Sequence, residues 1–347
     1  MKPTRTLVCS VVPVVTGVLA SACWLQPAFA AQATDGAIDA EAVARQNWGD
    51  FMTKNPESAQ GCFQASYPNY LWEKTDCKVA QPRVHPVHRK PGNGAAEVTG
   101  NGADYVAEAA GLITKTLGTF TKVTGVTSET GVGVAAFGGG GILGPNEYTL
   151  QINTNFTGTT SVCAGHSGCT VWQQFIYSPD YNVQGQAAVF MQYWLIGWGS
   201  RRCPSGWGSD GGGDCYRNSA FVAAPDLPIT SLANLTLSGS AVAGGNDTVV
   251  FTNGTTAYSI SAKDSVVDIS AVWRESEFNV VGNAGGSEAD FNSGSSVTVK
   301  VALTDGSTTA PTCVANAGST GETNNLNLGA CTTAGGTSPS IQFTESN

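Results

Sequence analysis

The sequence predicts an all-β fold: an antiparallel, jelly-roll-like β-sandwich stabilised by disulfides and preceded by a short region of one helix and a cysteine loop. Three observations predict it. Short segments of alternating residues recur along the chain, separated by turn sequences such as Asn253-Gly254. The composition is rich in glycine, with 43 residues, and only 12% of the chain is charged. The third observation is an even set of cysteines beyond the N-terminus.

Eight segments beyond residue 140 have the length and composition of strands, and nothing between them indicates alternating helices and a parallel sheet. The turn sequence Gly244-Gly245-Asn246-Asp247 separates two of them, and a glycine-rich loop is expected at residues 131–144. The predicted strands are residues 148–156, 171–177, 188–195, 234–238, 248–252, 256–261, 276–281 and 297–303.

The N-terminus has the pattern of a secretory signal peptide. Lys2 and Arg5 precede the apolar residues 7–25, and Ala28-Phe29-Ala30 is a small-residue cleavage site. We therefore expect residues 1–30 to be removed and the protein to be secreted or periplasmic. No later apolar stretch approaches the roughly 20 residues that span a bilayer, so no transmembrane anchor is expected.

Eight of the ten cysteines lie beyond this signal, and an even number in an exported chain indicates disulfides. Short loops between successive cysteines favour local pairing. Zinc is a poor alternative, because no two cysteines have the two-residue spacing of a zinc site. The expected pairs are Cys62 with Cys77, Cys163 with Cys169, Cys203 with Cys215, and Cys313 with Cys331.

Residues 31–94 are expected to form an N-terminal region distinct from a β-sandwich domain at residues 95–347. A helix over residues 37–52 and a cysteine loop are followed by a Pro-rich, basic linker at residues 82–95. This region is either a propeptide, for which Arg89-Lys90 would suit a processing protease, or an arm packed on the main domain.

Composition excludes several classes of function. The net charge of −9 would repel a phosphate backbone, so nucleic acid is not an expected partner. The chain has only three histidines, His85, His88 and His166, and none is placed as the base of a serine or cysteine nucleophile. No cofactor is implied. Asp210 and Asp214 could hold calcium, but two carboxylates are few ligands for this ion. No metal site is therefore predicted.

The stretch of residues 170–198 contains two aromatic segments joined by a polar loop. Because side chains alternate along a strand, Trp172 and Gln174 share one face of the first segment. Gln192 and Trp194 likewise share one face of the second. Each face therefore carries a glutamine beside a tryptophan.

A second informative stretch is residues 270–278, in which Trp273, Glu275 and Glu277 are expected to share a strand face. Two carboxyl groups beside an apolar ring would have raised pKa values, as a general acid or base in acidic medium requires. The alternative is that both glutamates lie on the solvent face while Phe278 packs inward.

These segments resemble the secreted glutamic peptidases. Residues 271–278, AVWRESEF, are similar to the Ala-Glu-Trp-Ile-Val-Glu-Asp-Phe segment of the eqolisins, and residues 172–175, WQQF, to their Leu-Gln-Thr-Gly segment. Residues 189–218 resemble the aromatic and Gly-Cys-Tyr-Asn segment of neprosin-type peptidases. The resemblance implies a two-sheet β-sandwich that hydrolyses peptide bonds in acid, with a glutamate that activates water and a glutamine that stabilises the oxyanion.

The resemblance assigns Glu277 as the base and Gln174 as the oxyanion stabiliser, with Glu275 and Gln192 as their substitutes. The sequence departs from the family pattern in two places: an ungapped match puts Ser276 at the catalytic position, and the Gln-Thr-Gly glycine is missing. The aromatic residues expected to bind a polypeptide substrate are Trp172, Trp194, Trp273 and Tyr193.

Two alternatives to an enzyme stay open. Trp198, Trp207 and Tyr216 surround the Cys203–Cys215 loop and could stack on sugar rings, which would make the protein a lectin-like binder of extracellular glycans. A surface or structural β-sandwich without a small ligand is the other alternative.

Overall fold

The computed structural model describes residues 35–79, 99, 103–133, 142–181, 184–200, 202–210, 212–284, 286–315 and 321–347. The predicted signal peptide and the predicted linker at residues 82–95 lie outside these ranges. Residues 1–43 and residues 44–347 form two separate units. Only the second contains the sheets.

The predicted helix is present as α1 (Asp35–Lys54). Trp48 and Met52, from its C-terminal half, are buried in a small cluster with Ala65 and Ala257. None of the described helices has the length and apolar character needed to cross a membrane.

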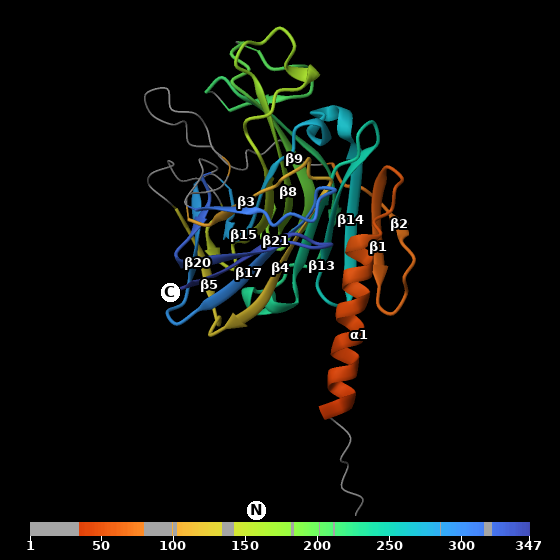
Figure 1. The fold of residues 1–347 in the computed structure, drawn as a ribbon, viewed down its shortest axis with the longest axis vertical. Helices are drawn as coiled ribbons and strands as arrows, with labels where there is room; N and C mark the ends of the chain where they lie inside the picture. The colour runs from red at the N-terminus through yellow and green to blue at the C-terminus, as the bar shows by residue number, and fades with distance from the viewer. Residues whose placement is uncertain are drawn as a thin grey trace, which may run out of the picture. The chain divides into compact units, whose positions relative to one another are not determined.

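The described residues form a nine-stranded antiparallel sheet, much of it labelled in Figure 1. Its N-terminal edge comes from the predicted cysteine loop, because β1 pairs with β14 over six residues. The strand order is β2 (Glu73–Thr75), β1 (Gly61–Ser66), β14 (Thr256–Lys263), β13 (Asn246–Thr252), β12 (Thr236–Ser240), β4 (Lys115–Thr124), β17 (Ser296–Thr304), β21 (Ser340–Ser346) and β20 (Asn327–Ala334).

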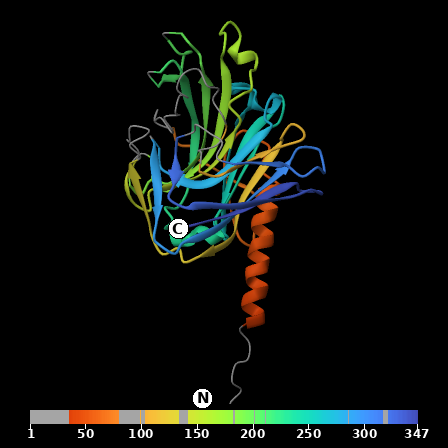
Figure 2. The same cartoon turned by 60° about the vertical axis from the view of Figure 1, so that its left-hand side comes forward.

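The second large sheet has eight antiparallel strands among the described residues. Three neighbouring strands of this sheet, β8, β9 and β11, lie side by side in green in Figure 2. The order is β10 (Gly208–Ser209), β11 (Cys215–Ala223), β9 (Ala188–Ile196), β8 (Thr170–Ser178), β7 (Tyr148–Thr154), β15 (Glu275–Gly282), β3 (Tyr105–Glu108) and β18 (Thr312–Ala315).

A smaller sheet and four short 3-10 helices complete the described structure. One pair of this smaller sheet, β16 with β19, is parallel. The sheet order is β19 (Thr323–Asn324), β16 (Ser287–Phe291), β5 (Glu129–Gly133) and β6 (Gly144–Pro145), and the 3-10 helices are η3 (Ser161–Cys163), η4 (Ile229–Asn234), η5 (Asp264–Val266) and η6 (Ile269–Ala271).

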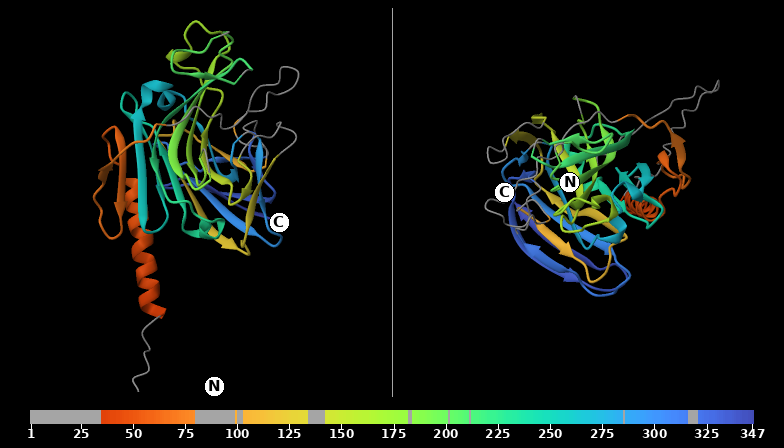
Figure 3. Two further views of the ribbon diagram at one scale, coloured as in Figure 1. Left: turned by 180° about the vertical axis from the view of Figure 1, so that it is seen from behind. Right: turned by 90° about the horizontal axis from the view of Figure 1, so that it is seen from above.

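The main hydrophobic core lies between the two large sheets. Tyr177 of β8 stacks on Phe251 of β13 with ring centroids 3.9 Å apart, and Phe278 of β15 meets Phe120 of β4 at 5.1 Å. Seen from above in Figure 3, the blue and orange strands curve past one side of the green strands. The predicted disulfide-bonded antiparallel sandwich is therefore confirmed.

Local sequence patterns also predicted the disulfides and one hairpin turn correctly. All four predicted disulfides are present. The β13–β14 hairpin turns at Asn253-Gly254, where Gly254 has φ of 86° and Asn253 Oδ1 accepts from two following backbone N–H groups. One prediction was wrong: residues 131–133 of the expected loop pair with β16 as part of β5, and residues 134–141 lie outside the described ranges.

Candidate functional site

One row of polar side chains crosses the eight-stranded sheet on the face turned away from the main core. Backbone pairing places five residues of successive strands directly opposite one another, so all five side chains project from the same face. We call them the amide row: Asn218 of β11, Gln192 of β9, Gln174 of β8, Asn153 of β7 and Glu277 of β15. The row thus brings Gln174 and Glu277 together on one face with a single strand between them.

Trp194 links the two glutamines of the row. Its indole Nε1 donates to Gln192 Oε1 at 2.9 Å and to Gln174 Oε1 at 3.2 Å. Gln192 Nε2 donates to Asn218 Oδ1 at 2.6 Å, and Asn218 Nδ2 donates to the hydroxyl oxygen of Tyr181 at 2.8 Å. These bonds fix the Gln174 carboxamide with its oxygen on Trp194 and its nitrogen on the side of β7.

Gln151, two residues before Asn153 on the same face of β7, connects the rest of the row. Gln174 Nε2 donates to Gln151 Oε1 at 3.0 Å, and Asn153 Nδ2 donates to Glu277 Oε2 at 3.0 Å. Asn153 Nδ2 also lies 3.5 Å from Gln151 Oε1. The Gln174 carboxamide and the Glu277 carboxylate are therefore held by neighbouring residues of one strand.

Glu322 is a second buried carboxyl group of this site. Gln151 Nε2 donates to Glu322 Oε2 at 2.6 Å, and the backbone N–H of Ala284 donates to Glu322 Oε1 at 2.9 Å. Burial raises the pKa of Glu322 to about 8 despite these hydrogen bonds, and the nearby charge of Glu277 adds to the rise. Glu322 therefore carries a proton in acidic medium.

An aromatic cluster borders the glutamine end of the row. Trp172 packs on Phe156 with ring centroids 4.5 Å apart and on Trp194 at 5.7 Å, and Tyr216 packs on Trp194 at 5.4 Å. The two expected face assignments of residues 172–194 are confirmed, because Trp172 and Trp194 lie in this cluster while Phe175 lies in the main core. Apolar ring faces and carboxamide groups therefore adjoin along β8 and β9.

Two of the aromatic residues expected to bind substrate lie elsewhere. Tyr193 belongs to the main core, and Trp273 stacks there on Phe175 with ring centroids 5.5 Å apart. The expectation that Trp273 shares a strand face with the two glutamates was wrong, because β15 begins only at Glu275. Glu275 and Glu277 do share a face, and Glu277 is buried rather than solvent-exposed.

The amide row is covered in the full chain, although Asn218 at its end is half-buried. Gln174 is 0% exposed and Glu277 is 1% exposed. Thr99 lies next to the row, against Glu275, which precedes Glu277 on the same strand face: its Oγ1 donates to Glu275 Oε2 at 2.5 Å and accepts from the Phe156 N–H at 3.3 Å. A polypeptide can reach Gln174 and Glu277 only if covering residues move.

Other side chains cover part of each aromatic ring considered for glycan binding. Trp198 stacks on His166 with ring centroids 3.3 Å apart, and Tyr216 is buried in the aromatic cluster. Trp207 is half-buried against the main core.

The candidate calcium residues are engaged within their own loop. Asp210 Oδ1 accepts from the backbone N–H of Gly212 and of Asp214, and Asp214 Oδ1 accepts from the Gly197 N–H at 2.6 Å. Within the described ranges no group of three histidine, cysteine or acidic residues is placed to hold a metal ion.

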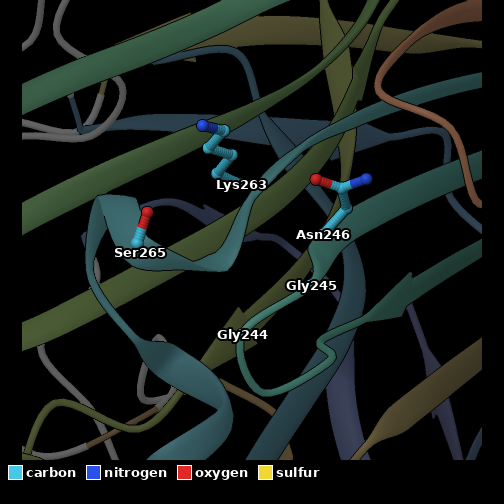
Figure 4. A pocket seen from close by; sticks show the side chains of 5 residues that line it. All are labelled: Gly244, Gly245, Asn246, Lys263 and Ser265. Atoms are coloured by element: carbon cyan, nitrogen blue, oxygen red, sulfur yellow. The ribbon is translucent and has the colours of Figure 1, made fainter.

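A surface hollow lies apart from the row, at the turn between β12 and β13 and at η5 (Figure 4). It shares no lining residue with the amide row. Its lining consists of Gly244, Gly245, Asn246, Lys263 and Ser265.

Sequence reasoning missed Gln151, Asn153 and Glu322. The first two were visible as the polar side of the alternation in residues 148–156, which was used only to predict a strand. Glu322 precedes a two-residue strand, and no local pattern indicates that it reaches the site. No protein-family model, curated protein or solved structure matches this chain.

Proposed function

We propose that the protein is a peptidase of the glutamic type, in which Glu277 is the general base and Gln174 the oxyanion stabiliser. The observation that supports this proposal most strongly is the amide row itself. A buried carboxylate and a buried carboxamide lie on one sheet face, one strand apart, and Asn153 and Gln151 orient them through hydrogen bonds. Aromatic rings beside them would bind apolar parts of a polypeptide.

Hydrolysis at such a site proceeds in two steps. Glu277 takes a proton from a water molecule as the water oxygen adds to the scissile carbonyl carbon, and the carbonyl oxygen becomes an oxyanion. The Gln174 Nε2–H group donates a hydrogen bond to that oxyanion. When the C–N bond breaks, the leaving amine takes the proton from Glu277, and a carboxylic acid and an amine are released.

Because the amide row is buried, a conformational change would be needed before a substrate could bind there. Because Gln174 and Glu277 are covered, we expect the chain to be latent until residues that cover this edge of the sheet, Thr99 among them, are displaced. Thr99 contacts Glu275 at the edge of the row, so displacement of the chain at Thr99 would open this edge. Removal of the residues that precede Thr99 in the chain, as the propeptide interpretation of residues 31–94 predicts, would allow this displacement.

The test is to hold the purified chain at about pH 4 and follow both its intact mass and the cleavage of an added denatured protein. Glu277→Gln and Gln174→Ala should each lower the cleavage rate, by at least about 100-fold for Gln174→Ala, because one oxyanion donor contributes 10²- to 10³-fold to kcat. Glu108→Gln, which changes an exposed carboxyl group of β3, is the matched control.

Three outcomes distinguish the assignments. Full activity in Gln174→Ala removes the oxyanion role from that residue. Loss of activity in Glu275→Gln but not in Glu277→Gln makes Glu275 the base. No cleavage by the wild-type chain, with an unchanged mass, would overturn the proposal and favour a glycan-binding function, to be tested by retention on polysaccharide and by Trp198→Ala and Trp207→Ala.

A further inference from the structure

The indole N–H of Trp172 is a buried donor beside Gln174. Trp172 is 0% exposed, and its Nε1 finds no hydrogen-bond partner within the described part of the chain. The neighbouring Trp194, which lies directly opposite on β9, donates its Nε1–H to both glutamines. An unpaired buried donor is unfavourable, so a native fold that keeps one requires an explanation.

A second polar atom without a partner among the described residues belongs to Asn153 of the amide row. Asn153 Oδ1 is buried and accepts no hydrogen bond from any described residue, although Asn153 Nδ2 is engaged by Glu277. Asn153 lies directly opposite Gln174, and Trp172 lies two residues before Gln174 on the same face. One unpaired donor and one unpaired acceptor therefore belong to neighbours of Gln174 on the same sheet face, and together they complement the C=O and N–H groups of a peptide unit.

The Gln174 carboxamide can also donate one further hydrogen bond. Its Nε2 carries two hydrogens, and one of them is used by Gln151 Oε1. Oxyanion-binding sites in hydrolases commonly combine two donors aimed at the same developing charge. The indole N–H is a suitable second donor because it is donor-only and does not titrate in the working range of pH.

We propose that the Trp172 Nε1–H is the second oxyanion donor of the site and acts together with Gln174 on the scissile carbonyl oxygen. This inference rests on the proposed peptidase function. As water adds to the carbonyl carbon and Glu277 takes its proton, the oxygen gains negative charge and accepts hydrogen bonds from Gln174 Nε2 and Trp172 Nε1. The indole keeps its own proton throughout, so Trp172 stabilises the transition state without exchanging a proton.

The test is Trp172→Phe, which removes the N–H group and keeps an aromatic ring for Phe156 and Trp194 to pack against. We expect kcat per processed molecule at pH 4 to fall about 100-fold with KM changed by less than about threefold, because the lost bond forms only in the transition state. The shape of the pH–rate profile should stay the same. Thermal stability should be equal or higher, because the variant no longer buries an unpaired donor.

Trp207→Phe is the matched control, since it makes the same change at a half-buried ring outside the row, and its kcat should equal that of the wild type. Wild-type kcat in Trp172→Phe would overturn the inference, and so would a shifted pH profile or a lowered melting temperature that accounts for the lost rate. If Glu277→Gln is inactive in the same experiment, the proposed function survives that failure. If the wild type cleaves nothing, both proposals fail.

Discussion

At the scale of single residues, two tryptophans that face each other across β8 and β9 have opposite hydrogen-bonding states. Trp194 donates to two carboxamide oxygens, whereas the Trp172 N–H is unpaired among the described residues. The same substitution should therefore have opposite effects on stability at the two positions. This contrast separates a donor that holds the site together from one that is available to a substrate.

We expect Trp194→Phe to lower the free energy of unfolding by about 1 to 3 kcal/mol, because it removes the donor shared by Gln174 Oε1 and Gln192 Oε1 inside the protein. Urea denaturation of this variant beside Trp172→Phe measures the difference. Equal destabilisation of both variants would mean that ring packing, rather than the N–H groups, determines the effect.

At the scale of the elements, two glycines of the nine-stranded sheet accommodate phenylalanine rings of the other sheet. A Cβ at Gly118 of β4 would lie 2.1 Å from Cγ of Phe278, and one at Gly239 of β12 would lie 2.4 Å from Cδ2 of Phe175. Both phenylalanines flank the site from beneath, because each is next in sequence to a residue of the row. The glycines thus set how closely the sheets approach behind Gln174 and Glu277.

Gly118→Ala and Gly239→Ala should each destabilise the fold by about 1 to 3 kcal/mol or more, because the ring must shift within a packed core. Gly49→Ala is the matched control. A Cβ at Gly49 would lie 3.5 Å from Thr252 Oγ1, an ordinary contact, and alanine in a helix is favoured by up to about 1 kcal/mol. Melting curves of the three variants test this prediction. An unchanged melting temperature in Gly118→Ala would show that the sheets can separate without loss of stability.

At the scale of the whole molecule, several carboxyl groups outside the amide row are buried. Burial is the main cause that raises the pKa of Glu129, Glu322 and Glu345 to about 8 and that of Asp247 to about 9. The folded chain keeps these protons at pH values where the unfolded chain has released them. Buried acids of this kind make the folded state more stable at acidic than at neutral pH.

We therefore expect the free energy of unfolding to decrease as pH rises from about 4.5 to about 8. Within this window the unfolded state binds fewer protons than the folded state, so stability falls with pH, and it levels off once the folded groups also ionise. The melting temperature at pH 5 should exceed that at pH 8 by about 5 °C or more.

The buried aspartate gives a direct check of this cause. Asp247→Asn should reduce the difference between the two melting temperatures, because asparagine has no proton to lose, whereas Glu108→Gln at an exposed position should leave the difference unchanged. A melting temperature that is constant or rises from pH 5 to pH 8 would contradict the expectation.

The sequence by itself determined features that depend on neighbours along the chain. Alternation placed Trp172 with Gln174 and Gln192 with Trp194, and both pairs share a face as expected. The short sequence separations between successive cysteines predicted all four disulfides correctly, because closing a short loop costs little chain entropy. The helix at residues 37–52 and the eight predicted strands follow from the same local periodicities.

Only the tertiary structure decided which strands are neighbours and in which register. β7 lies between β8 and β15, and this order brings Asn153 and Gln151 between Gln174 and Glu277. Glu322 reaches the same place from a segment with no periodic pattern. Alternation assigns a side chain to one of two faces, whereas register and strand order depend on pairing between residues far apart in the chain, and no local pattern encodes that pairing.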